Sequence, residues 1–365
     1  MPRRAFHLVR CLLFVAVLLY GCGTGRASEA PFAPDASPPS AEPHVALLLP
    51  TGSEAFAAPA EAVRAGFLEA AKKSQRPLPV RLYAVTDDPQ VVIAAYRRAV
   101  AAGAELVVGP LTRNGVTALA AASEVITVPT LALNVPERAA ATPFSQLFTL
   151  SLQIEAEARQ VAQLALSEGR RRAFIVSTPA ALSQRMREAF TEAFERGGGH
   201  VIADYAYAAD PAALERLRQA SALGVADMVF YAIDAPRLRT VRPYTAAITG
   251  YGTSQLNPGA ALASPGDPVV DVRFVDMPWM EQPEHPAVMV YARAGPREND
   301  DFERLYALGV DACRLAQDLL TGKRDIELDG VTGRLRLGLD GQFRRGLLVT
   351  LIDSGRLTVL GESRP

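Results

Sequence analysis

The chain has 365 residues, of which 49% are hydrophobic, and its 38 lysines and arginines against 39 acidic residues leave a formal net charge of −1. This balance lacks the excess of positive charge that nucleic-acid-binding domains show, so no nucleic acid is expected as a partner. The length exceeds what one hydrophobic core usually covers, which favours two globular parts.

Residues 1–21 have the pattern of a secretory signal peptide. Three arginines precede an apolar run from Cys11 to Tyr20. The run is shorter than the roughly 20 apolar residues that a membrane-spanning helix needs, so export is favoured over a transmembrane anchor. Removal of this segment would leave a net charge of about −4, because it contains three arginines and no acidic residue.

The tetrapeptide LYGC, which ends at Cys22, resembles the lipobox of bacterial lipoproteins. In that motif cleavage makes the cysteine the new N-terminus and its sulfur receives a diacylglycerol, so we expect Cys22 to be lipidated. Tyr20 stands where a small residue is usual, and an incidental thiol is the alternative. The residue after the cysteine is Gly23 and not an aspartate. In enteric-type bacteria the resemblance then implies sorting to the outer membrane, with the acyl chains as the anchor.

The segment after Cys22 reads as a tether. Residues 23–43 consist mainly of Ala, Pro, Ser and Gly, a composition that buries too little apolar surface to fold. The lipidated cysteine and flexible tether therefore occupy 22–43. Once Cys11 leaves and Cys22 is lipidated, only Cys313 remains, so no internal disulfide can form in an oxidising compartment.

From residue 44 onward, buried strand patterns alternate with amphipathic helix patterns. The first series predicts strands at 44–49, 80–85, 105–108 and 128–133 and helices at 61–73, 90–102 and 114–122. The second predicts helices at 153–168, 182–196, 212–220 and 236–244 and strands at 173–177, 200–205, 227–232 and 245–249. Such alternation is typical of parallel sheets built from βαβ units.

The regular alternation stops after Pro258. A stretch rich in Pro and Gly is followed by a predicted helix at 302–320 and by strands around the turn Asp340-Gly341. We therefore predict an α/β fold of two lobes, each a largely parallel sheet flanked by helices. Lobe 1 would comprise 44–149 plus about 282–340, and lobe 2 about 150–281 plus 341–365.

Several segments of the chain resemble a known fold and family. The segments HVALLLP at 44–50, EAVRAGF at 61–67, ELVVGPL at 105–111 and VPTLALN at 128–134 resemble the periplasmic-binding-protein type I fold. The chain is more narrowly similar to the LpoA/LppC lipoproteins, through DMVFYA at 227–232, VRFVDMPWM at 272–280, YALGVDA at 306–312 and GVTGRL at 330–335.

This resemblance implies a non-catalytic lipoprotein of the outer membrane, facing the periplasm, that activates a class A penicillin-binding protein, the synthase of peptidoglycan. The best-known member has a helical-repeat domain before this module, whereas here we expect only the tether. A periplasmic solute-binding receptor of an ABC transporter or a sensing system is the alternative. No small-molecule ligand can be named from the sequence.

In type I binding proteins the ligand lies between the lobes, beside the carboxyl ends of the strands. The residues at such positions are Thr51, Ser53, Thr112 and Asn134 from lobe 1 and Tyr231, Asp234, Thr253 and Ser254 from lobe 2. Their hydroxyls, amide and carboxylate suit a small polar ligand. Helix capping is the alternative, above all for Ser53 and Thr112. The clamp of amino-acid-binding relatives is not reproduced.

Two groups of residues suggest a partner surface. Arg334, Arg336, Arg344 and Arg345 flank the terminal hairpin, where they either meet a partner or keep an exposed strand soluble. Trp279 either anchors a partner or packs against the hinge.

No catalytic constellation is found. Gly250-Tyr251-Gly252 is interpreted as a turn because the third glycine of a dinucleotide loop is missing. The histidines have no metal-ligand spacing, and no Gly-x-Ser-x-Gly motif occurs. We therefore expect no enzymatic activity, no metal and no cofactor.

Overall fold

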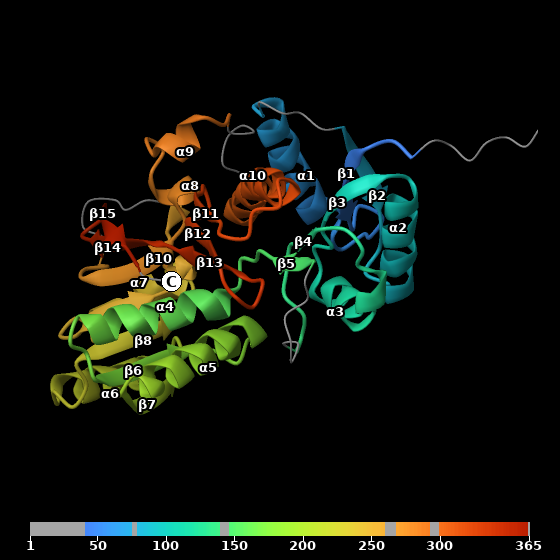
Figure 1. Cartoon of the computed structure of the whole chain (residues 1–365). Helices are drawn as coiled ribbons and strands as arrows, with labels where there is room; N and C mark the ends of the chain where they lie inside the picture. Colours follow the sequence, from blue (N-terminus) through green and yellow to red (C-terminus); the bar gives the residue numbers. More distant parts are fainter. Residues whose placement is uncertain (1–40, 75–78, 139–145, 260–267, 293–298, 364–365) are drawn as a thin grey trace, which may run out of the picture. The chain divides into compact units, whose positions relative to one another are not determined.

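The computed structural model describes residues 41–74, 79–138, 146–259, 268–292 and 299–363. They form two main sheets with flanking helices and one small antiparallel sheet (Figure 1). The predicted mixed α/β fold with parallel sheets is confirmed. The predicted signal peptide, Cys22 and nearly all of the tether lie outside the described residues.

The first sheet is entirely parallel and has the strand order β2-β1-β3-β4-β5. Side chains of β1 are buried along its whole length, which explains its continuous apolar sequence. The strands are β1 (His44–Leu49), β2 (Val80–Ala84), β3 (Ala104–Val108), β4 (Thr130–Ala132) and β5 (Leu147–Thr149).

Helices from both ends of the described chain cover this sheet. They are α1 (Ala57–Lys72), α2 (Pro89–Ala101), α3 (Arg113–Ala121), the short η1 (Ser123–Val125) and α10 (Asp300–Leu320). Helices α1 and α10 lie side by side (Figure 1) and approach closely at two glycines. A Cβ on Gly66 would lie 1.9 Å from the carbonyl oxygen of Tyr306, and one on Gly309 would lie 2.1 Å from that of Val63. The C-terminal helix α10 is thereby fixed on the first sheet.

The second sheet has the strand order β15-β14-β10-β9-β8-β6-β7. Five strands are parallel, and the C-terminal hairpin adds two antiparallel strands at one edge. The strands are β6 (Arg172–Ser177), β7 (His200–Ala206), β8 (Met228–Ala232), β9 (Thr249–Gly252), β10 (Val272–Asp276), β14 (Leu348–Asp353) and β15 (Arg356–Glu362).

Helices cover both faces of this sheet. Ile175 of β6 joins the core cluster of α4 and α5, whereas its neighbours Phe174 and Val176 join the cluster of α6 and α7. Successive side chains of a strand point to opposite faces, so the two helix pairs lie on opposite sides. The elements are α4 (Ile154–Ser167), α5 (Ala181–Arg196), α6 (Pro211–Ala222), α7 (Ala235–Val241), η2 (Arg242–Tyr244), η3 (Ser254–Leu256), α8 (Pro278–Glu281) and α9 (Pro286–Met289).

The interpretation of Gly250-Tyr251-Gly252 as a turn is wrong, because all three residues belong to β9. A Cβ on Gly250 would lie 2.7 Å from the Tyr231 ring, and one on Gly252 would lie 2.3 Å from the Leu256 side chain. The glycines therefore make room for neighbouring side chains within the sheet.

The third sheet is a small antiparallel one in the order β11-β12-β13. Its strands are β11 (Glu327–Asp329), β12 (Arg334–Leu337) and β13 (Phe343–Gly346). The predicted turn at Asp340-Gly341 is confirmed, with Gly341 at a φ of 77°. The turn lies beside the first sheet, since the amide of Thr149 in β5 donates to the carbonyl oxygen of Gly341.

Candidate functional site

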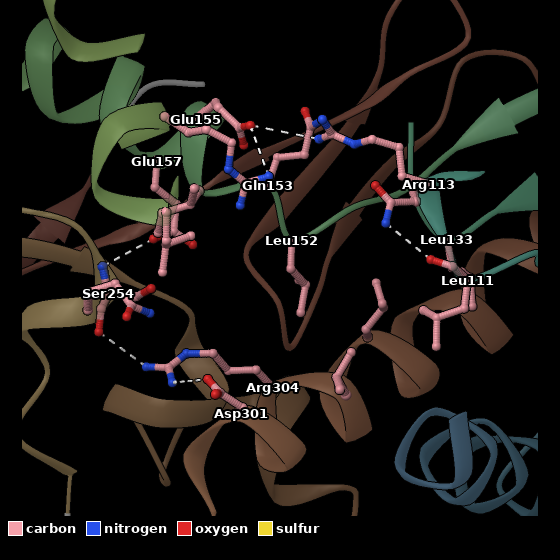
Figure 2. A pocket seen from close by; sticks show the side chains of 17 residues that line it. Leu111, Arg113, Leu133, Leu152, Gln153, Glu155, Glu157, Ser254, Asp301 and Arg304 are labelled. Atoms are coloured by element: carbon pink, nitrogen blue, oxygen red, sulfur yellow. Dashed lines mark hydrogen bonds and ion pairs between the residues drawn. The ribbon is translucent and has the colours of Figure 1, made fainter. Parts of the chain in front are cut away.

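A pocket of about 550 Å³ lies between elements of the two main sheets. Its walls come from the loop before α3, the segment after β4, the first turn of α4, the start of α5, η3 and α10 (Figure 2). One part of the lining is aliphatic and consists of Ile154 and the leucines Leu111, Leu133, Leu152, Leu182, Leu305 and Leu308. The remaining lining residues are polar or charged.

At the first turn of α4, one carboxylate meets two arginines from different elements. Glu155 Oε1 lies 3.7 Å from Arg113 Nη2 at the start of α3 and 3.5 Å from Arg185 Nη1 of α5. These ion pairs connect a helix of the first sheet with two helices of the second. Two cations share one anion, so this cluster carries one excess positive charge.

A buried ion pair involves Glu157, two residues further along α4. Glu157 Oε1 lies 3.4 Å from Arg345 Nη2, and Glu157 Oε2 accepts from the amide of Ser254 at 3.1 Å. Burial raises the pKa of Glu157, against the opposing effect of the Arg345 guanidinium, and burial lowers the pKa of Arg345. The expectation that Arg345 lies on the surface is therefore wrong, because it pairs with the one carboxylate that α4 turns inward at this point.

Arg304 of α10 extends along the pocket toward Ser254 (Figure 2). Its Nη2 donates to Asp276 at 2.6 Å and to the carbonyl oxygen of Ser254 at 3.4 Å. Burial lowers the pKa of Arg304, but the Asp276 carboxylate outweighs that effect and holds the pKa above its usual value. Arg304 Nε is buried and has no hydrogen-bond partner among the described residues.

A second carboxyl group belongs to the same network. Asn257 Nδ2 donates both to Asp276 at 2.8 Å and to Glu281 of α8 at 2.6 Å. Burial, together with the Asp276 carboxylate, raises the pKa of Glu281 to about 7. The protonation of Glu281 therefore changes near neutral pH.

Of the cleft residues predicted in lobe 1, only Asn134 lines the pocket. Its Nδ2 donates to the carbonyl oxygen of Leu111 at 3.1 Å. Thr112 caps α3, as the alternative interpretation had it. Thr51 and Ser53 lie in the loop after β1 and are not among the lining residues.

Of those predicted in lobe 2, only Ser254 lines the pocket. Asp234 caps α7, and Thr253 is buried and caps η3. Tyr231 is fully buried, with its hydroxyl bonded to Thr245. The sequence thus located the two edges of the pocket but missed the charged residues of α4, α5 and α10. These residues could have been suspected from a charge on the apolar face of an amphipathic helix, such as that of Glu157.

The partner surface predicted from sequence is partly wrong. Trp279 is fully buried: its ring packs 5.4 Å from that of Tyr306, and its Nε1 donates to Glu303 at 2.7 Å. It therefore joins α8 to α10 and is no surface anchor. Arg334 and Arg336 are exposed, with side chains 49% and 62% accessible.

Among the residues that the structure describes, no helix is both long and apolar enough to cross a bilayer. The same part of the chain holds no cluster of three His, Cys, Asp or Glu side chains arranged for a metal ion.

Comparison with known proteins places the chain among binding-protein-like lipoproteins. A family model described as "LppC putative lipoprotein" matches residues 40–349. The penicillin-binding protein activator LpoA of Photobacterium profundum is 24% identical over 335 residues, which cover 82% of this chain and 54% of that protein. The chain thus spans about half the length of this relative.

Solved structures agree with the fold. A protein of Chromobacterium violaceum, described as a "putative branched-chain amino acid ABC transporter", is 38% identical with a TM-score of 0.71, and the match covers 85% of this chain and all (100%) of that one. Full-length LpoA of Haemophilus influenzae is 20% identical with a TM-score of 0.73, covering 87% of this chain and 58% of that one. These likenesses confirm the predicted periplasmic-binding-protein type I-like fold.

Proposed function

Because the chain belongs to the LppC family of lipoproteins, we propose that it is a lipid-anchored regulator that activates a class A penicillin-binding protein in peptidoglycan synthesis. The observation that carries this proposal is the family match over 40–349, joined by the resemblance to a protein named as an activator of this kind. The name of this relative states the activity, and the same activity is what we propose for this chain.

The N-terminal sequence supports the place from which the protein would act. Cys22 would carry the acyl chains, and residues 23–43 would hold the folded part away from the membrane. Gly23 favours the outer membrane. The folded part would then face the periplasm.

The small sheet β11-β12-β13 is the surface we propose for docking. Its outward side chains include Arg334 and Arg336, which are paired with Glu327 at 3.7 Å and 3.2 Å. Leu339 at the hairpin turn is fully exposed. A surface of mixed charge selects a partner of complementary pattern more than it adds affinity, so it suits a regulatory contact. Activation would follow if this surface contacts the active state of the synthase better than the inactive state.

Retention of a synthase tests the proposal. The full-length protein is immobilised in detergent and incubated with membrane extract of its own bacterium, and the bound proteins are labelled with fluorescent penicillin. We expect a class A penicillin-binding protein to be retained, and the double variant Arg334→Glu, Arg336→Glu to release it. The matched control Arg216→Glu, Arg218→Glu reverses two charges on α6 and should retain it. If no penicillin-binding protein is retained, the activator proposal is wrong.

A solute-binding receptor is the second candidate function. The protein of Chromobacterium violaceum is 38% identical and is matched over all (100%) of its length. The pocket of about 550 Å³ gives such a function a site. A free branched-chain amino acid that raises the melting temperature, with no synthase retained, would favour this candidate.

A further inference from the structure

The lining of the pocket restricts the chemistry of what it can hold. None of its described lining residues is aromatic. Nucleobases and quaternary ammonium groups are usually held by aromatic rings, so neither class fits this lining. Leucines and one isoleucine form the apolar part, which favours a ligand with aliphatic side chains.

The polar part of the lining is suited to amide groups. Asn134, Gln153, Gln255 and Ser254 all line the pocket. The side-chain amides of Gln153 and Gln255 make no hydrogen bond within the described part of the chain, so their donors and acceptors are available. A peptide group carries one donor and one acceptor, which is the complement of a side-chain amide.

Two charged groups indicate how a ligand would be oriented. Arg304 lines the pocket, and its Nε is a donor with almost no exposed surface and no partner among the described residues, so an acceptor reaches it once the side chain shifts on binding. A peptide carbonyl oxygen would supply that acceptor. At the rim, Arg113 and Arg185 share the single carboxylate of Glu155, and the excess positive charge suits a free carboxylate.

From these features we infer that the pocket binds a short peptide with aliphatic side chains and a free carboxylate. Its terminal carboxylate lies at the Arg113–Glu155–Arg185 cluster, and one of its carbonyl oxygens accepts from Arg304 Nε. The volume of about 550 Å³ falls within the range of about 300–1,000 Å³ typical of pockets for drug-sized ligands, which leaves room for a short peptide. The inference concerns the pocket alone, and it stands whether or not a synthase is the partner.

Direct binding tests this assignment. Purified full-length protein in detergent is titrated by calorimetry with tri- and tetrapeptides of Ala, Val and Leu, with their C-terminal amides, and with free leucine. We expect the free-carboxylate peptides to bind, the amides to bind about fivefold more weakly, which is what one exposed ion pair contributes, and leucine not to bind measurably.

Two variants locate the bound groups. Arg185→Gln removes the excess charge and should lower the affinity for the free-carboxylate peptides to that for the amides. The matched control Arg187→Gln, two residues along α5 and paired with Asp204, should leave binding unchanged. Arg304→Lys keeps the positive charge beside Asp276 but loses Nε, so all peptides should bind about tenfold more weakly.

Three results would overturn the inference: no peptide of the panel binds, leucine binds as tightly as the peptides, or the amides bind as tightly as the free acids. Equal effects of Arg185→Gln and Arg187→Gln would also overturn the placement of the carboxylate. Because no synthase is present in this experiment, its failure is distinguishable from failure of the activator proposal.

Discussion

Glu281 should make the stability of this protein depend on pH near neutrality. Burial and the Asp276 carboxylate raise the pKa of Glu281 from 4.5 to about 7. The folded state therefore holds this proton more tightly than the unfolded state, so stability falls as the pH rises from about 4.5 to about 7. At about 1.4 kcal/mol for each pH unit, the loss would be about 3 kcal/mol, which partial access of water reduces to about 2 kcal/mol.

The substitution Glu281→Gln isolates this effect, since glutamine retains an oxygen that accepts from Asn257. Urea unfolding of wild type and variant should give equal free energies at about pH 4 and a variant that is more stable by about 2 kcal/mol at about pH 8. The contribution of Glu157, whose pKa is also raised, is common to both proteins and cancels. The control Glu284→Gln, at an exposed neighbouring position, should follow wild type. If the free energy of unfolding varied with pH in the same way for wild type and Glu281→Gln, the reasoning would be refuted.

Two further substitutions test the close approach of α1 to α10 and the buried ion pair. Gly66→Ala should lower the stability by about 2 kcal/mol or more, because its Cβ would meet the backbone of α10, and thermal unfolding measures this loss. The stabilisation that Gly→Ala ordinarily gives inside a helix would contradict the close approach. Arg345→Met should cost about 3 kcal/mol or more, since it leaves Glu157 buried without its cation, and adding Glu157→Gln should restore part of that loss. Strictly additive free energies in this double-mutant cycle would show that the pair is not coupled.

Most elements of the fold could be predicted from sequence because their hydrophobic periods are local and strong. Strand β1 is buried on both faces and reads as one apolar run, and α10 has a sustained helical period over 300–320. Strand β10 was missed because the Pro- and Gly-rich sequence around it suggests a loop, and only pairing with β9 and β14 reveals it. Sheet pairing is a long-range property that a local pattern does not contain.

The site was harder to predict than the fold for a physical reason. The rule that ligands bind at the carboxyl ends of strands picks out polar residues by their position in the following loop. Several of these residues cap helices instead, as Thr112 and Asp234 do. The charged groups of the pocket come from helix faces, where a charge is ordinarily expected to be solvated. Glu157 and Arg345 are 188 residues apart in sequence, so neither identifies the other as its partner.

The pocket and the small sheet proposed for docking are connected by direct contacts. Arg345 belongs to β13, pairs with Glu157 of the pocket lining, and donates through Nη1 to the carbonyl oxygen of Thr332, two residues before β12. A ligand that displaces Glu157 must therefore alter a contact of the sheet. Linkage between two binding sites is reciprocal. If the proposed synthase prefers one arrangement of β12 and β13, its binding would change the affinity of the pocket for the ligand, and ligand binding would change the affinity of this protein for the synthase by the same factor. Because Glu157 and Arg345 are both buried, separating them leaves a buried charge without its partner, so the pair opposes any change that moves β13 away from α4.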